Sequence, residues 1–513
     1  GVFHSNTVDL NFACEGQELI AVMKHTPEHL KSIYSSFQAN GKLSCEGNIK
    51  GLVSKGINPA LSMTCHIDKG NFNLKSRPFI LKRVSLDGKI TNGDERNFRK
   101  TKIEISQFDA KTENGFIKGD FTIQNLNKYY LTANLNSSWD LAEINHYFED
   151  SPFFNLQGKL LTNTQYSGYI SFDSRFKNYF LTAKHNSSTS FENASFTYKN
   201  FPLSFNFQSA DCAFKNNNIE VKNSAFTIAD SDLNFNGDIT DLIGYILNRK
   251  DKIDVVGNLN STYIKFDELL TLKDLSEGES IGIMPTWINA ILNTNISTFS
   301  YDDFIASDIT GKLAYKNLTL TGENMLLNSL NGNIAGNFKF YETANNKLKL
   351  FSQLNLKQLN IRNAFLAFDN FKQDFITAEH IKGMGTAEIQ MQATWKPGFI
   401  FEEEDLKVKS HLVIEKGELI QFKPLESLSD YVSLEDLKTV KFSTLENTIE
   451  IDNKVITIPT MEIKSSALSV FVSGTHTFEQ EINYHIKLLL SELMSTKFRK
   501  KNTQIKKTEF GEI

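Results

Sequence analysis

The residues that most often carry out chemistry in proteins are thinly spread along this chain. Its 10 histidines are scattered, and neither an HExxH helix nor a GxSxG elbow occurs. Gly383-Met-Gly385 approaches a dinucleotide-binding fingerprint, but Glu388 takes the third glycine position and the segment opens a predicted strand. We therefore interpret these glycines as turn residues. We predict no enzymatic activity, no catalytic residue and no cofactor, with a triad assembled from distant positions as the open alternative.

The cysteines do not form a recognised metal or redox motif. There are four of them, Cys14, Cys45, Cys65 and Cys212. None belongs to a CxxC pair and no histidine cluster lies nearby, which argues against a zinc site or a thioredoxin-like motif. We interpret them as small buried apolar groups. A disulfide between Cys45 and Cys65 is the alternative in an oxidising compartment.

Three other kinds of motif have simple interpretations. The acidic clusters Glu402–Asp405 and Asp302-Asp303 contain the oxygen ligands of a hard cation, but we expect solvated turns there and predict no metal. Asn136-Ser-Ser and Asn186-Ser-Ser match the glycosylation pattern, which arises readily by chance in an Asn-rich chain. The basic stretch Lys497–Lys507 is either a solvated linker or a contact with an anionic membrane surface.

Composition narrows the class of protein. The net charge is -5, with a pI near 6.1, which gives no global attraction for nucleic acid, and we predict no nucleic-acid partner. The chain has 41 Phe but only 3 Trp and 9 Pro. Aromatic residues suit a pleated sheet, and scarce proline suits ladders that need their N–H groups. At 513 residues the chain is too long for one compact core.

Period-two alternation is the dominant pattern from Gly41 to Phe478. Short runs alternate apolar with polar residues and end at Gly, Asn or Asp, which is typical of half-buried antiparallel strands. One face of each strand should therefore be dry, covered either by a second sheet or by an apolar ligand. The candidate residues of this dry groove face are Leu131, Leu135, Leu203, Phe205, Phe207, Leu233, Phe235, Leu318, Leu320, Ile449, Ile451, Ile456, Ile458, Leu468, Val470 and Val472. Neighbours of opposite parity, such as Ser204, Asn206, Glu450 and Ser469, should face water.

Few helices interrupt this pattern. The predicted helical segments are Glu18–Gln38, Leu141–Phe148, Leu242–Asn248, Trp287–Leu292, Arg362–Phe371 and Pro424–Lys438. No apolar run approaches the ~18 residues of a membrane-spanning helix, and the N-terminus does not carry a signal peptide. We expect the natural protein to extend beyond both ends of this sequence.

A region near the C-terminus resembles a known family. The runs that carry the resemblance are Leu412-Val-Ile-Glu-Lys-Gly-Glu-Leu-Ile-Gln-Phe-Lys-Pro-Leu, Phe442-Ser-Thr-Leu-Glu-Asn-Thr-Ile-Glu-Ile, Ile456-Thr-Ile-Pro-Thr-Met-Glu-Ile-Lys-Ser-Ser-Ala-Leu and Ser473-Gly-Thr-His-Thr-Phe. In this order they resemble the C-terminal region of the AsmA-like proteins of Gram-negative bacteria. Gly41-Lys-Leu-Ser-Cys-Glu-Gly-Asn-Ile-Lys-Gly looks like the family's entry into its first repeats.

The resemblance implies a fold, a location and a role. AsmA-like proteins are similar to the repeating β-groove, bridge-like lipid-transfer proteins. Together with the alternation, this predicts a mainly β protein: an elongated, twisted, mostly antiparallel sheet curled into an open apolar groove, a β-taco, with a few short helices. The family implies a periplasmic body anchored to the inner membrane by an N-terminal helix, which is absent here. It has no catalytic signature.

The resemblance also implies partners and an organisation. The expected partners are phospholipid acyl chains, the inner and outer membranes, and other periplasmic or outer-membrane proteins. Phospholipid would be held or conducted along the groove between the membranes, supporting outer-membrane homeostasis. The expected parts are residues 1–150 (helix and first repeats), 151–375 (middle repeats), 376–495 (AsmA-like C-terminal region) and 496–513 (basic tail).

Two other functions stay open at this point. The family has also been linked to outer-membrane protein assembly, which sheet edges could serve by β-augmentation. A stack of β-sandwiches with a structural or glycan-binding role is the other alternative. Glycan binding would need aromatic platforms, and 3 Trp make it less attractive.

Overall fold

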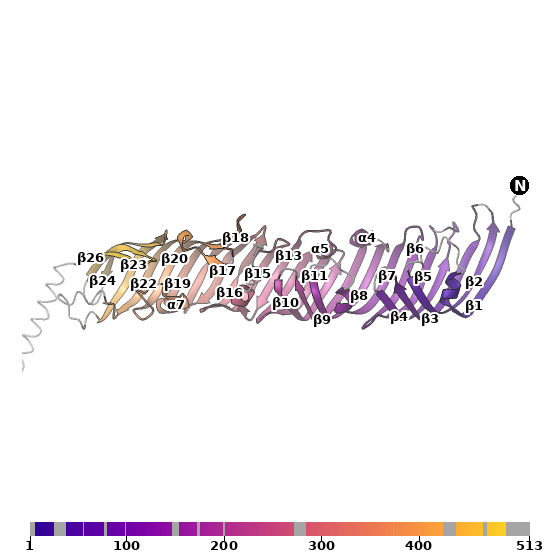
Figure 1. The fold of residues 1–513 in the computed structure, drawn as a ribbon, viewed down its shortest axis with the longest axis horizontal. Coiled ribbons are helices and arrows are strands. Elements are labelled where there is room, and N and C mark those ends of the chain that lie inside the picture. The colour runs from indigo at the N-terminus through magenta and orange to yellow at the C-terminus, as the bar shows by residue number, and fades with distance from the viewer. Residues whose placement is uncertain are drawn as a thin grey trace, which may run out of the picture. The chain divides into compact units, whose positions relative to one another are not determined.

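The structure is a computed structural model of the 513-residue chain. It describes residues 6–24, 37–54, 56–75, 79–97, 99–145, 153–171, 175–198, 201–270, 284–372, 374–397, 399–423, 435, 438–464 and 469–488. Strands make up 72% and helices 10% of the structure. Figure 1 shows the ribbon with its element labels.

The strands follow one another along almost the whole chain. They are β1 Asn6–Glu18, β2 Phe37–Val53, β3 Ala60–Leu74, β4 Phe79–Thr91, β5 Lys102–Lys111, β6 Phe116–Gln124, β7 Tyr130–Asp140, β8 Phe153–Tyr169, β9 Lys184–Tyr198, β10 Phe201–Lys215, β11 Asn218–Ile228, β12 Ser231–Thr240, β13 Ile253–Ser261, β14 Ile264–Lys265, β15 Ile288–Tyr301, β16 Phe304–Lys316, β17 Thr319–Ser329, β18 Gly332–Glu342, β19 Leu348–Asn360, β20 Ile381–Lys396, β21 Ile400–Phe401, β22 Lys407–Ile420, β23 Thr439–Asp452, β24 Val455–Lys464, β25 Ser469–Thr477 and β26 Ile482–Leu488.

Short helices stand between some of these strands. They are α1 Leu19–Lys24, α3 Leu141–Asn145, α4 Phe176–Thr182, α5 Leu242–Ile246, α6 Phe266–Leu270, α7 Ile361–Ala367, and the 3-10 turns η3 Asp369–Lys372 and η4 Glu403–Asp405. None exceeds two helical turns, so the helices join and cover strands and do not form a layer of their own.

The 26 strands belong to one open sheet. Almost every strand pairs antiparallel with its neighbours in the chain, as in β1–β2, β2–β3 and β9–β10. The short β14 is an exception and pairs parallel to β15. The prediction of a mainly β protein built on one open, mostly antiparallel sheet with a few short helices is therefore confirmed.

The chain divides into two compact units, each of which is described by itself. Unit 1 contains residues 1–229 and 233–257, and unit 2 contains residues 230–232 and 258–513. Within each unit the strands follow in chain order (Figure 1). The boundaries expected at residues 150, 375 and 495 stay predictions.

Tight turns hold several hairpins together in unit 2. β16 and β17 are joined by Asn317 and Leu318, both with positive φ, and β23 and β24 by Asn453 and Lys454 in the same conformation. Two successive positive φ angles characterise the type I′ turn, whose twist matches that of paired strands. Asparagine tolerates this conformation better than most residues. Leu318, a predicted groove residue, thus lies in a turn.

Unit 1 has one apolar sheet face. Residues opposite each other in an antiparallel pair project to the same side, so the registers trace rows across the strands. One row contains Cys14, Cys45, Cys65, Gly88, Ile105, Phe121 and Ala133. The next contains Leu43, Ile67, Leu86, Phe108, Gly119 and Leu135. We call this side the apolar face of unit 1.

Unit 2 has a matching apolar face. One of its rows contains Gly322, Phe338, Ser352, Met391, Val408, Ile451 and Ile456. Another contains Gly336, Leu354, Ile389, Ser410 and Ile449. Bulges between Gly322 and Met325 and between Lys382 and Met384 shift the register. Each extra residue lets the strand bend while apolar side chains stay on the same side.

Helices cover parts of both apolar faces. In unit 1, Leu19 of α1 packs against Leu43 and Ile67, and Phe180 of α4 stacks on Tyr166 with ring centroids 6.1 Å apart. In unit 2, α7 packs in the same way. Its Ile361 and Phe365 lie against a cluster of Ile381, Ile414 and Phe442.

Several of the predicted helices are present in the structure, and one prediction is wrong. Segments α3, α5 and α7 fall where helices were expected. The predicted helix Glu18–Gln38 is confirmed only at α1, because Glu18 belongs to β1 and Gln38 to β2, and residues 25–36 lie outside the described ranges. The prediction of a helix at Trp287–Leu292 is wrong, because β15 begins at Ile288 and Ala290 and Leu292 pair with β16. A proline before an apolar run looked like a helix start, but long-range pairing decides the conformation. Most of Pro424–Lys438 and the whole basic tail lie outside the described residues.

The buried position of Leu348 gives a test of the packing in unit 2. Its side chain is fully buried opposite Trp395, so Leu348→Ala should lower the free energy of unfolding by about 2–5 kcal/mol. Leu326→Ala is the matched control, because Leu326 is 54% exposed and should change stability by less than about 0.5 kcal/mol. Urea unfolding of both variants measures the difference. Equal losses would contradict the packing described.

Candidate functional site

The predicted groove residues are half-buried in most cases. Phe235 and Val470 are buried, at 9% and 7% exposure. The half-buried residues are Leu131, Leu135, Leu203, Phe205, Phe207, Leu233, Leu318, Leu320, Ile449, Ile451, Ile456, Ile458 and Val472. Leu468 lies outside the described residues. These side chains are thus partly covered by their neighbours and still reach solvent.

Neighbours of opposite parity mostly differ from them. Ser204 and Asn206 in β10 and Glu450 in β23 are exposed, whereas Ser469 is half-buried. The two faces of these strands therefore have different solvent contact. Binding of lipid by the half-buried face stays a prediction.

An aromatic cluster occupies the apolar face of unit 1 on β9, β10 and β11. Phe196 stacks on Phe205 and Phe207, with ring centroids 5.0 and 5.6 Å apart. Phe207 in turn stacks on Phe226 at 4.9 Å. Such ring pairs each contribute about 0.5–1.5 kcal/mol beyond the area that they bury. The cluster presents a continuous apolar surface to whatever covers this face.

A chain of hydroxyl groups interrupts the same face next to this cluster. The indole N–H of Trp139 donates to Ser137 Oγ at 2.8 Å. Hydroxyl–hydroxyl hydrogen bonds then lead on through Thr162, Thr164, Ser187 and Thr189, at 3.2, 3.0, 2.8 and 3.2 Å. We call this set the hydroxyl ladder. It crosses three strands, because Ser137 lies in β7, Thr162 and Thr164 in β8, and the last two in β9.

The ladder satisfies most of its polar groups internally. Its five hydroxyls and one indole hold six donor hydrogens, and the hydrogen bonds above use five of them. One O–H hydrogen and several oxygen lone pairs are left for another partner. Beside the ladder lies His185, whose buried Nε2 lacks a protein partner among the described residues. Burial lowers the pKa of His185 and so favours the neutral form of its ring.

Sequence reasoning missed the hydroxyl ladder. The signal was present, because Thr162-Asn-Thr164 and Ser187-Ser-Thr189 place hydroxyls at period two. Ser137 and Ser187 are also the central residues of the two triplets read as chance glycosylation patterns. Strand registers, which the sequence does not contain, were needed to bring these residues together.

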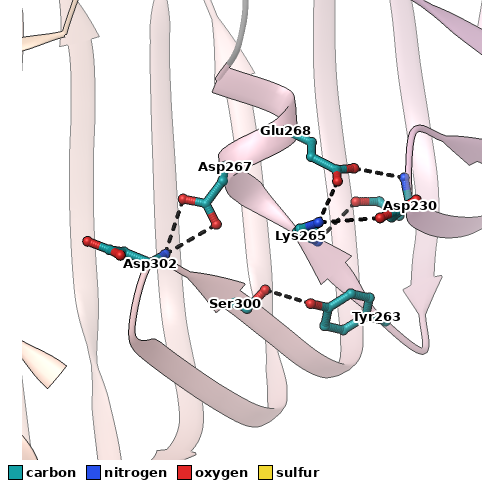
Figure 2. A network of polar contacts seen from close by, with 8 residues as sticks. Asp230, Tyr263, Lys265, Asp267, Glu268, Ser300 and Asp302 are labelled. Carbon is teal, nitrogen blue, oxygen red and sulfur yellow. Dashed lines mark hydrogen bonds and ion pairs between the residues drawn. The ribbon is translucent and has the colours of Figure 1, made fainter.

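A polar network in unit 2 has a structural role. Figure 2 shows Lys265 between Asp230 and Glu268, with Nζ–oxygen distances of 3.3 and 2.6 Å. Glu268 also accepts a hydrogen bond from the Asp230 backbone N–H at 2.9 Å. On the far side of α6, the Asp302 backbone N–H donates to both oxygens of Asp267, at 3.1 and 3.2 Å. The network ties α6 to the turn at Asp230 and to the β15–β16 turn.

In the acidic cluster Glu402–Asp405, three carboxylates lie near lysines. Glu402 has Lys347 Nζ at 2.7 Å and Lys396 Nζ at 3.3 Å. Lys454 lies within 3.7 Å of Glu403 and 3.6 Å of Glu404. Among the residues that the structure describes, no group of His, Cys, Asp and Glu side chains is arranged to hold a metal ion.

Comparisons with protein-family models, with curated proteins and with solved structures return no match. In the described ranges, no helix combines the length and the apolar character needed to cross a membrane.

Removing the central hydroxyl of the ladder should destabilise unit 1. Thr164→Val keeps the side-chain shape but takes a partner from both Thr162 and Ser187. We expect a loss of about 1–3 kcal/mol in the free energy of unfolding, the cost of leaving polar groups unsatisfied. Thr132→Val on the exposed side of β7 is the control and should be nearly neutral. Thermal or urea unfolding compares the two. A neutral Thr164→Val would show that the ladder contributes nothing.

Glu402 gives a pH-dependent test. The hydrogen bond from Lys347 holds the pKa of Glu402 below its ordinary value of 4.5. A carboxylate with a lowered folded-state pKa stabilises the fold above its unfolded pKa and loses this contribution as pH falls through the folded pKa. Wild type should therefore be more stable than Glu402→Gln at pH 7, and the gap should close as the pH drops below 4.5.

Thermal denaturation across this pH range measures the gap. Glu403→Gln is the control, since Glu403 is 52% exposed and its lysine is 3.7 Å away, so its gap should be small at every pH. A gap for Glu402→Gln that stays constant with pH would contradict the ion-pair assignment.

Proposed function

We propose that the apolar face of the sheet binds phospholipid acyl chains, and that the protein holds or conducts phospholipid between the inner and outer membranes without chemical turnover. The observation that carries the proposal is the half-burial of large apolar side chains along one face of an open sheet. In a sealed sandwich, residues such as Phe205 and Ile451 would be buried by a second sheet. In this open sheet, we propose that a ligand covers these residues.

Energetics favour an apolar chain as the ligand. Each CH₂ group removed from water contributes about 0.8 kcal/mol, and the protein side of the contact gains as well. An acyl chain adapts to a row of mixed Phe, Ile, Leu and Val side chains because it is flexible and needs no directed hydrogen bond. The stacked rings of Phe196, Phe205 and Phe207 offer a continuous surface for it.

The hydroxyl ladder fits the polar part of the same ligand. A phospholipid has ester carbonyl oxygens between its chains and its head group, and these accept hydrogen bonds. The spare O–H hydrogen of the ladder is a matching donor. In the proposal, acyl chains lie over the aromatic cluster, esters lie near the ladder, and the head group stays in water.

The membrane context of this proposal comes from the sequence. The resemblance of residues 412–478 to AsmA-like proteins supports a periplasmic body attached to the inner membrane. The absence of a recognised catalytic motif agrees with a passive role.

The edges of the sheet support a second candidate function. β26 pairs only with β25 among the described residues, and it exposes Ile482 and Ile486 at 43% and 44%. An apolar edge strand with free backbone groups can add a strand from another chain. An assembly factor for outer-membrane proteins would use this edge in place of the apolar face.

Charge placed on the apolar face tests the first function. Phe205→Asp in unit 1 and Val472→Asp in unit 2 replace half-buried side chains. Both variants should stay folded, because water can reach an open face and solvate the carboxylate, and both should lose bound phospholipid. Native mass spectrometry of the purified chain should detect co-purified phospholipid in wild type and in the controls Asn206→Asp and Thr457→Asp, whose side chains are exposed. Outer-membrane permeability in cells provides the second readout.

The outcomes separate the candidates. If native mass spectrometry finds no phospholipid on the wild-type chain, the result favours an assembly factor that acts through the sheet edge. If both face variants unfold, as expected when a charge enters a sealed core at a cost of several kcal/mol, the apolar face is an ordinary core and the lipid proposal is wrong.

A further inference from the structure

Three cysteines form a row across the first three strands of unit 1. Cys14 in β1 lies opposite Cys45 in β2, and Cys45 lies opposite Cys65 in β3. All three are half-buried free thiols on the apolar face. Cys212 is separate from the row, because it lies in β10 opposite Thr189 and Val221.

Cys14 and Cys45 are placed to bond covalently. Their Sγ atoms are 2.7 Å apart, not far from the ~2.05 Å of a disulfide bond. Directly opposed residues of antiparallel strands have Cα atoms about 4.5–5.5 Å apart, within the roughly 4.4–6.8 Å range that a disulfide spans. A small side-chain rotation would close the bond without moving the backbone.

The third thiol has a different environment. Cys65 packs against the buried cluster of Leu19, Ala39, Leu43 and Ile67 beneath α1. Burial raises the pKa of Cys65, and it also raises the pKa of Cys45, to about 11, so the contact between Sγ atoms distinguishes the Cys14–Cys45 pair and thiolate abundance does not. Cys45 therefore contacts the thiol of Cys14 on β1, while the side chain of Cys65 on β3 packs against the hydrophobic cluster.

We propose that Cys14 and Cys45 form a cross-strand disulfide that fastens β1 to β2, the one strand with which β1 pairs among the described residues. This proposal is independent of lipid binding. β1 has no buried side chain and mixes exposed with half-buried positions, so hydrogen bonds to β2 provide most of its attachment. A covalent link would keep this strand paired where side-chain packing contributes little.

The oxidant can be any small disulfide, and glutathione disulfide is the probe. One cysteine thiolate attacks it, forming a mixed disulfide and releasing one glutathione thiol. The second cysteine then attacks the protein sulfur of that mixed disulfide and releases the other glutathione thiol. Two protein thiols are oxidised to one S–S bond while one glutathione disulfide is reduced to two thiols, and the protons pass to the released thiolates.

The test uses the full chain equilibrated in mixtures of reduced and oxidised glutathione. After alkylation of free thiols, tryptic digestion without reduction separates all four cysteines into different peptides, since lysines lie between them. We expect mass spectrometry to find peptide 1–24 joined to peptide 43–50. Amide exchange in β1 should slow by at least about tenfold on oxidation, because the link restricts opening.

Serine variants decide which thiols take part. Cys14→Ser and Cys45→Ser should abolish the link and the added exchange protection, while Cys65→Ser and Cys212→Ser should keep both. Circular dichroism of the reduced variants should match that of reduced wild type, which shows that the variants fold. The proposal is overturned if no link forms at any glutathione ratio, or if peptide 43–50 is joined to peptide 56–69 in place of peptide 1–24.

Discussion

A single physical constraint underlies this structure: a strand sends alternate side chains to opposite faces, and in one open sheet only one of those faces is apolar. In a sandwich a second sheet would cover that face. Here the cover is partial and comes from short helices such as α1, α4 and α7, which pack on the apolar face through Leu19, Phe180 and Ile361. The bulges and the half-burial of the apolar rows follow from the same constraint. If a strand slipped by one residue, all its apolar side chains would turn to the face in water.

Hydroxyl groups on the apolar face of unit 1 satisfy one another. The ladder from Ser137 to Thr189 does this by passing hydrogen bonds along hydroxyls of neighbouring strands. Charged groups lie elsewhere, either at strand junctions, as in the contacts of Lys265 and Glu402, or on the opposite face, as in the pair of Lys409 and Glu450. Hydroxyls suit this face better than charged groups do, since they cost less to desolvate.

Periodicity made much of the fold predictable, and pairing accounts for what was not. Runs such as Leu203 to Phe207 and Ile449 to Ile451 reveal strand, face and parity from local sequence alone. The strand that begins at Ile288 was predicted as a helix, because its apolar start looked helical, but pairing with β16 decides its conformation. Strand β1 was not predicted, because its alternation between exposed and half-buried positions is weak. The hydroxyl ladder and the cysteine row depend on which residues face each other across strands. Such register information is absent from any single strand's sequence.

Pairing between chain neighbours also has a consequence for how such a sheet forms. Within each unit most strands pair with the strand that follows them in the chain, which favours growth by adding one hairpin after another to an existing edge. Stability then approximates a sum of interfaces between adjacent strands, as in repeat proteins. In such an array a hairpin inserted or deleted as a pair preserves strand direction, so evolution can lengthen or shorten the sheet in steps of two strands.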